Sequence, residues 1–210
     1  MSADFPIVAL VCSAGGLGAL TRVLAPLPAD LPAAVIVLQH LDPERASLLP
    51  ALLHGRTAMP VAPATDGAAL RPGQVLVAPP GQHTLVTAGL TVALIPSGRL
   101  PPYRPSADLL LTTLAIAAGT RVIAVVLSGA GNDAATGATA VHHFGGTVVA
   151  SSVATSEYSA MPQATIGRDH AINHIVALDD VAGLLLRLVT APLTDQPGAA
   201  HTGVQSPGDG

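Results

Sequence analysis

The sequence predicts an α/β fold, a doubly wound, mostly parallel sheet with helices on both faces and an antiparallel β-hairpin appendage. Short β-branched runs alternate with longer stretches of helical period along most of the 210 residues. This is the pattern of parallel strands joined by crossover helices. In the middle of the chain, apolar and polar residues alternate around Ala88 and Gly89 instead, as they do in a hairpin.

The chain opens with a predicted βαβ unit. Strands are expected at 6–12 and 33–39, with a helix at 16–27 between them. Leucine and valine recur in this helix at three- and four-residue spacing, so one stripe packs on the sheet while Arg22 faces water.

The rest of the chain first departs from the α/β pattern and then returns to it. A strand at 74–80 ends in two prolines, and a hairpin follows at 83–95. Ser106 suits a helix start because its hydroxyl can accept from a free backbone N–H group. The remaining predicted elements are a helix from Ser106 to about Gly119, a strand at 122–127, a helix after Asp133, a strand at 147–151, and a last helix carrying Leu178, Val181, Leu184, Leu185 and Leu188.

One domain at 1–190 and a disordered tail at 191–210 are expected, because the tail is rich in Pro and Gly and has no apolar period. Half of the chain is hydrophobic, but 19 Pro and 21 Gly break it into pieces too short to span a bilayer. We therefore expect no membrane insertion.

Composition excludes several classes of protein. All nine basic residues are Arg and thirteen carboxylates outnumber them, so nucleic acid is not an expected partner. The single Cys12 cannot form an intrachain disulfide, and the N-terminus lacks a secretory pattern, which together predict a cytoplasmic location. No CxxC pair offers a thiolate zinc site, and we expect neither a metal nor an organic cofactor.

Three polar residues, Ser13, His40 and Asp133, follow predicted strands. Open parallel sheets build their sites at the carboxyl ends of strands. A Ser-His-Asp triad is therefore a hypothesis that the sequence alone supports.

The turn that contains Ser13 has three competing interpretations. A dinucleotide-binding turn requires GxGxxG spacing, which Gly15, Gly16 and Gly18 do not have. A purely structural turn would use the glycines only for positive φ and close packing. In a nucleophile turn, Ser13 attacks an ester carbonyl and the backbone N–H groups of Ala14 and Gly15 stabilise the oxyanion.

His40 and Asp133 each have a structural alternative as well. A lone His is commonly a packed or surface residue, and seven others are present, but His40 directly follows a predicted strand. Asp133 lies near a helix N-terminus, where a capping role is favoured. That cap is compatible with a carboxylate that orients the His40 imidazole.

Taken together, ordered motifs over roughly 6–189 resemble the catalytic domain of the chemotaxis receptor methylesterases, the CheB-type protein-glutamate methylesterases. These motifs are CSAGG with Ser13, VIVLQH with His40, DGAALRPGQVLVAPPGQH at 66–83, YRPSADLLL at 103–111, LSGAGNDAATG at 127–137 and EYSAMPQA at 157–164.

The resemblance implies roles for these residues. Ser13 is the nucleophile, His40 the general base and Asp133 the orienting carboxylate, and no cofactor is required. Family members often carry Met where this chain has Ala130, so the acyl pocket, to which we also assign Met161, is expected to be wider or reshaped.

The implied activity is removal of methyl esters from glutamates of chemoreceptor-like proteins through an acyl-enzyme, with glutamine deamidation in some members. Since the first strand is predicted close to Met1, we expect a stand-alone catalytic domain without a phosphoacceptor domain, served by separate signalling regulators. The main alternative is a catalytically weak or inactive interaction module of a chemosensory pathway. A dinucleotide-binding enzyme is the third hypothesis.

Overall fold

The computed structural model describes residues 4–98 and 103–191 and confirms the predicted fold class. Seven parallel strands form one sheet in the order β3-β4-β2-β1-β7-β8-β9. The hairpin forms a separate two-stranded antiparallel sheet. The strands are β1 (Ile7–Cys12), β2 (Ala34–Gln39), β3 (Val61–Pro63), β4 (Val75–Val77), β5 (Gln82–Val86), β6 (Val92–Pro96), β7 (Val122–Val126), β8 (Thr147–Ser151) and β9 (His174–Val176).

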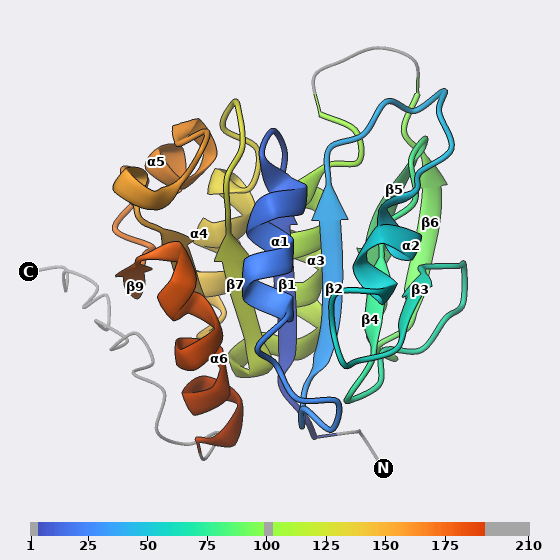
Figure 1. The fold of residues 1–210 in the computed structure, drawn as a ribbon, viewed down its shortest axis with the longest axis horizontal. Coiled ribbons are helices and arrows are strands. Elements are labelled where there is room, and N and C mark those ends of the chain that lie inside the picture. Colours follow the sequence, from blue (N-terminus) through green and yellow to red (C-terminus); the bar gives the residue numbers. More distant parts are fainter. Residues whose placement is uncertain (1–3, 99–102, 192–210) are drawn as a thin grey trace, which may run out of the picture.

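Helices cover both faces of the large sheet (Figure 1). On one face α1, α2 and α6 pack against the strands, and on the other face α3 and α4 do so. The helices are α1 (Gly16–Leu24), α2 (Leu49–His54), α3 (Ala107–Ala118), α4 (Ala135–His143), α5 (Ala160–Ile166) and α6 (Val181–Thr190), with short 3₁₀ turns at Gly119–Arg121, Val153–Thr155 and Leu178–Asp180.

The central strand β1 separates two hydrophobic cores. All six of its residues are fully buried, and successive side chains alternate between the two faces of the sheet. Its alternate residues from Ile7 pack toward α3, and those from Val8 pack toward α1. Burial of each such Val, Leu or Ile side chain contributes about 1.5–3 kcal/mol, so this strand is a rigid platform for the residues that follow it.

The hairpin packs beside helix α3, whose start bears on the functional site. Val86 pairs with Val92 across the hairpin, and the backbone N–H of Val86 donates to the Thr113 hydroxyl of α3 at 3.1 Å. The predicted appendage is thus confirmed, and it is anchored to a helix rather than to the edge of the large sheet.

Several short elements differ from the sequence-based expectation. The strand predicted at 74–80 is only Val75–Val77, and β3, β9, α2 and α5 were not predicted. Three-residue strands and one- or two-turn helices are too short for a period to be recognised. The predicted tail lies outside the described residues, apart from its first residue, Ala191.

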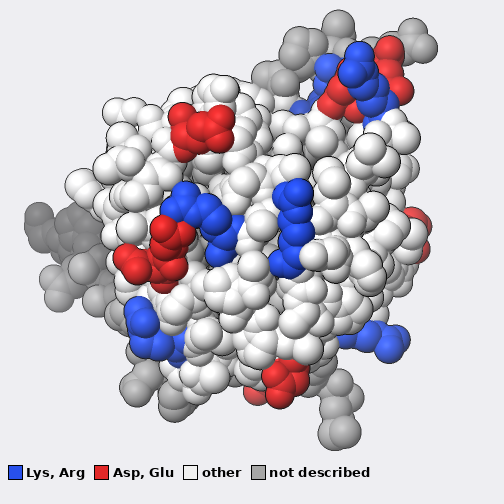
Figure 2. Space-filling view, viewed as in Figure 1, with Lys and Arg blue, Asp and Glu red and all other residues white. Residues whose placement is uncertain are grey.

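The surface has few charges. Figure 2 shows a mainly uncharged face on which some basic groups lie beside acidic ones, with no continuous cationic patch on that face. No helix in the described ranges 4–98 and 103–191 is long and apolar enough to cross a membrane.

Candidate active site

The site lies at the carboxyl ends of the central strands. Strand β1 has β2 on one side and β7 on the other. The chain therefore runs from β1 to one side of the sheet and later comes back to the opposite side of β1, so the connections diverge at the end of this strand. Such switch points form crevices in open α/β sheets. Because Cys12 pairs with Gln39, Ser13 and His40 occupy the next positions of adjacent strands.

Ser13 is held in a tight turn between β1 and α1. Its backbone N–H donates to the Ser128 carbonyl at 2.9 Å, and its carbonyl accepts from the Gly16 N–H at 3.0 Å. Gly15 adopts the left-handed conformation at φ 72°, where a Cβ would lie 2.7 Å from the Ser128 hydroxyl oxygen. The turn therefore requires glycine at this position for both conformation and space.

Asp133 is almost fully buried and binds the start of helix α3. Its Oδ2 accepts from the Ala107 N–H at 2.6 Å, and its Oδ1 accepts from the Asp108 N–H at 3.0 Å and the Ser106 hydroxyl at 3.3 Å. A cap on the helix that follows Asp133 was predicted, and this was wrong: α4 begins after Ala134 without a side-chain cap. The chain passes from Asp133 through a positive-φ residue, Ala134, which directs the carboxylate to the neighbouring helix.

Ser106 is the N-cap of α3, as predicted. Its hydroxyl oxygen accepts from the Leu109 N–H at 3.3 Å. Asp133, just before α4, binds the start of α3, and Asp108 of α3 likewise accepts from the Gly137 N–H of α4 at 2.7 Å. The two helix starts are therefore tied to one another beside the site.

His40 lies between Asp133 and the cavity. Its Nε2 is 2.8 Å from Asp133 Oδ2, and their side chains are 12% and 2% exposed. Because Nε2 faces the carboxylate, Nδ1 is the ring nitrogen available to Ser13. No hydrogen bond joins Ser13 to His40 in the described part of the chain, and unliganded sites commonly have such loose geometry.

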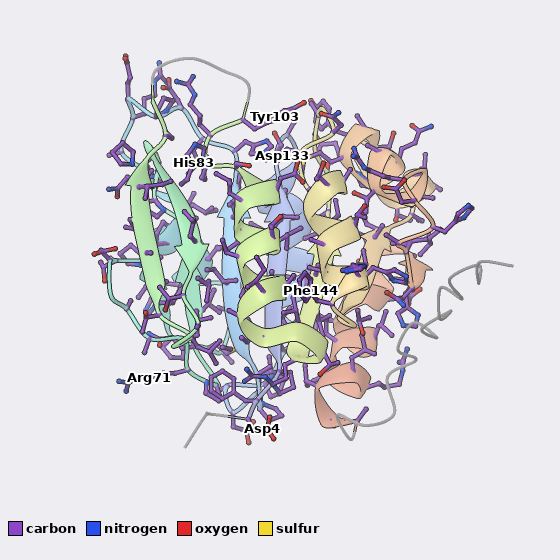
Figure 3. All side chains as sticks on the ribbon, turned by 180° about the vertical axis from the view of Figure 1, so that it is seen from behind. Asp4, Arg71, His83, Tyr103, Asp133 and Phe144 are labelled. Atoms are coloured by element: carbon purple, nitrogen blue, oxygen red, sulfur yellow. The ribbon has the colours of Figure 1, made fainter. Side chains whose placement is uncertain are left out.

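Tyr103 covers the imidazole and holds the loop before Asp133. Its ring stacks on His40 at a centroid distance of 5.2 Å, and its hydroxyl donates to Asn132 Oδ1 at 2.8 Å. The hydroxyl also accepts from the Asn132 N–H at 3.2 Å. Figure 3 shows Tyr103, Asp133 and His83 gathered at the same end of α3.

The electrostatics keep Asp133 ionised. Burial alone would raise its pKa, but the hydrogen bonds from His40 and from the N–H groups of Ala107 and Asp108 outweigh burial and hold the pKa below its usual range. Burial raises the pKa of Asp108, and the negative charge of Asp133 adds to this against the opposing bond from Gly137. The surroundings thus favour the ionised form of Asp133, which faces His40, more than that of Asp108.

His83 supports the same helix start. Its Nδ1 accepts from the Ser106 N–H at 2.9 Å, which places its ring proton on Nε2. Burial lowers the pKa of His83, although the nearby charge of Asp133 opposes this. The lowered pKa favours the neutral ring, whose Nδ1 can accept from the N-cap residue of α3.

A cavity of about 570 Å³ contains Ser13 and His40. Ala130 is in its wall, and the other lining residues are Leu41, Asp42, Pro43, Tyr103, Arg104 and Gly131. Met161 was expected to line the acyl pocket, but it is fully buried and does not line this cavity. Its sulfur packs against Gly129, where a Cβ would overlap it, so Met161 lies beneath the loop that contains Gly129 and Ala130. Cys12 is also fully buried, and burial raises the pKa of its thiol, as befits a packing residue rather than a nucleophile.

Four contributors to the site were missed from the sequence: Tyr103, His83, Ser128 and the N-terminus of α3. All four lie in motifs that carried the resemblance, namely YRPSADLLL, DGAALRPGQVLVAPPGQH and LSGAGNDAATG, and this was the available signal. Within the described residues, no cluster of three or more His, Cys, Asp or Glu side chains could hold a metal ion.

Comparisons with known proteins agree on one family. The family model described as CheB methylesterase matches residues 8–185. A protein-glutamate methylesterase/protein-glutamine glutaminase of Moorella thermoacetica is 36% identical over 188 residues, which are 88% of this chain and 44% of that protein. One from Burkholderia lata is 35% identical over 189 residues, covering 90% of this chain and 56% of the relative.

The fold agrees with the same family. The crystal structure of the Thermotoga maritima CheB methylesterase catalytic domain matches with a TM-score of 0.84 and 30% identity, covering 89% of this chain and all of that one. The chain spans about half the length of the curated relatives it matches.

Proposed function

This chain belongs to the CheB methylesterase family, and from that premise we propose that it is a serine hydrolase that removes methyl esters from protein glutamates. The observation that carries the proposal is the hydrogen bond of 2.8 Å between His40 and the buried, ionised Asp133, beside the cavity that contains Ser13. This arrangement provides a nucleophile, a base and an orienting carboxylate.

In the first half of the reaction, the Ser13 Oγ attacks the ester carbonyl and its proton passes to His40 Nδ1. Asp133 accepts from Nε2–H, which keeps the other ring nitrogen free as the base and stabilises the imidazolium. The tetrahedral oxyanion is stabilised by the backbone N–H groups of Ala14 and Gly15. When it collapses, methoxide leaves with the proton of His40 as methanol, and the acyl group remains on Ser13.

In the second half, water attacks the acyl-enzyme while His40 takes one of its protons. Collapse of the second tetrahedral intermediate returns that proton to Ser13 and releases a glutamate side chain. A glutamine amide enters the same sequence with ammonia as the leaving group. The printed names of the relatives join these two activities.

The substrate we propose is a methylated chemoreceptor-like protein, and we propose that the enzyme acts on it in the cytoplasm. Asp42 and Arg104 are among the residues that line the cavity, so it offers charged groups to a side chain presented by a large partner. Separate signalling regulators complete the proposed set of partners.

Methanol release from methylated receptor membranes tests this proposal. The wild type should release methanol. Ser13→Ala should lose most of the rate and keep a small remaining rate that comes from substrate binding and oxyanion stabilisation. Ser151→Ala is a matched control because Ser151 is fully buried outside the cavity. Equal rates in the wild type and Ser13→Ala would remove Ser13 from the mechanism, and a folded wild type without turnover or labelling by a fluorophosphonate would favour a non-catalytic interaction module.

A further inference from the structure

We propose that Ser128 is a positioning residue that orients the Ala14–Gly15 peptide, so that the Gly15 N–H is directed at the oxyanion. The inference rests on the proposed hydrolase function and extends it to a residue outside the triad. Ser128 follows strand β7 and is 1% exposed.

The Ser128 hydroxyl connects two loops of the site. It donates to the Ala14 carbonyl at 2.8 Å and accepts from the Tyr158 N–H at 2.9 Å. The Tyr158 carbonyl is further away, at 3.4 Å, and already accepts from the Gly129 N–H at 2.8 Å. The single hydroxyl proton is therefore assigned to Ala14. The backbone carbonyl of the same Ser128 holds the Ser13 N–H.

These bonds determine the direction of the predicted oxyanion donors. In a trans peptide, the carbonyl of one residue and the N–H of the next point in opposite directions. The Ser13 carbonyl is held by the Gly16 N–H, which sets the direction of the Ala14 N–H. The Ala14 carbonyl is held by the Ser128 hydroxyl, which directs the Gly15 N–H away from Ser128.

The two peptides differ in how they are held. The Ser13–Ala14 peptide is fixed by a backbone bond within the turn, which no side-chain substitution removes. The Ala14–Gly15 peptide depends on a side chain, and it adjoins Gly15 at φ 72°, a residue with unusual rotational freedom. Loss of the Ser128 hydroxyl would therefore leave this peptide free to rotate.

Substitution of Ser128 should consequently change turnover more than substrate binding. Ser128→Ala leaves the Ala14 carbonyl and the Tyr158 N–H without their partner, and the Gly15 N–H is no longer held in place. Removal of a whole oxyanion donor typically costs about 10²–10³-fold in kcat. For a donor that is misdirected rather than removed, we expect a loss of about tenfold to a hundredfold in kcat with KM nearly unchanged. Ser128→Thr retains the hydroxyl and should keep most of the rate.

The experiment measures kcat and KM on p-nitrophenyl acetate, together with the rate of phosphonylation by a fluorophosphonate. The variants are Ser128→Ala, Ser128→Thr and Ser151→Ala, each assayed below its own melting temperature. Ser151 is a matched control because its fully buried hydroxyl is 2.8 Å from that of Ser156, and Ser151 does not line the cavity that contains Ser13. A loss in both rates for Ser128→Ala alone, recovered in Ser128→Thr, supports the proposal.

Two results overturn it, and they are distinguishable. If the wild type is active and Ser128→Ala behaves as Ser151→Ala does, Ser128 is only structural and the hydrolase function stands. If the folded wild type neither turns over the ester nor is labelled, the hydrolase function fails and Ser128 has no oxyanion donor to position.

Discussion

Replacement of Asp133 by Asn separates the charge of this residue from its shape. The two carboxylate oxygens have different partners: Oδ2 accepts from His40 and the Ala107 N–H, whereas Oδ1 accepts from the Asp108 N–H and the Ser106 hydroxyl. If the Asn oxygen takes the place of Oδ2, it keeps the bonds of 2.8 and 2.6 Å. The NH₂ then opposes the Asp108 N–H, whereas the Ser106 hydroxyl can rotate to accept from it.

The reverse orientation would place the NH₂ against the Ala107 N–H at the 2.6 Å position and against His40 Nε2. The first orientation is therefore favoured, and Asp133→Asn should preserve the tautomer in which His40 Nδ1 is the base. This differs from a site in which the carboxylate contacts only the histidine.

The magnitude follows from the lost charge. A hydrogen bond to a charged group contributes about 1.5–3 kcal/mol and a neutral one about 0.5–1.5 kcal/mol. The imidazolium formed in the transition state thus loses about 1–2 kcal/mol, which is about fivefold to thirtyfold in kcat. Asp133→Ala removes the acceptor altogether and should cost about 10³-fold or more. It should also lower the free energy of unfolding by about 2–6 kcal/mol, since two N–H groups of α3 lose their acceptor.

The assay is kcat on p-nitrophenyl acetate, with urea unfolding to establish that each variant is folded. Asp179→Asn is a control, because Asp179 is an exposed carboxylate whose pKa is lowered by its hydrogen bond with Arg22, far along the chain from the triad. Asp133→Asn as inactive as Asp133→Ala would refute the orientation argument. Wild-type kcat in Asp133→Ala would refute any role for this carboxylate.

Three further predictions concern stability and specificity. The pKa of Asp133 is lower in the folded than in the unfolded protein. Its contribution to stability is therefore complete above about pH 4, the unfolded value, and is lost as the pH falls through the folded value. In urea unfolding, the free energy of unfolding should fall more steeply below about pH 4 in the wild type than in Asp133→Asn, and parallel curves would contradict this. Gly131→Ala would bring a Cβ to 2.5 Å from the Tyr103 hydroxyl at φ 86°, so kcat and the melting temperature should both fall, whereas Gly18→Ala, with no atom within 4 Å, should lower neither. Ala130→Met should narrow the cavity and lower kcat/KM for p-nitrophenyl butyrate relative to the acetate by about tenfold, and an unchanged ratio would place Ala130 outside the acyl pocket.

The central strands could be predicted from the sequence because they are continuous apolar runs buried on both faces. Strand β1 was expected at 6–12 and lies at Ile7–Cys12, and the predicted strand-end positions of Ser13 and His40 follow directly from parallel pairing. Short edge strands such as β3 and β9 carry too few residues to establish a period.

The partners of Asp133 could not be predicted, because they depend on tertiary packing. Local sequence suggested a cap on the following helix, but the carboxylate binds the N–H of Ala107, 26 residues earlier. Ser128 lies in the motif LSGAGNDAATG, but its hydrogen bond with Ala14 joins residues 114 positions apart and could not be predicted from the sequence. Ser13 and His40 could be proposed from the sequence because each directly follows a predicted strand, and the structure places both after strands of the sheet.

Mapping the site of phosphonylation tests whether Ser13 is the nucleophile and His40 its base. The protein is treated with a fluorophosphonate, digested and analysed by mass spectrometry, with Ser13→Ala and His40→Gln in parallel. We expect one label per chain on Ser13, no label in Ser13→Ala, and labelling slowed strongly in His40→Gln because the base is lost. A label on another serine, or an equal rate of labelling at Ser13 in His40→Gln, would contradict the assignment of Ser13 and His40 as nucleophile and base.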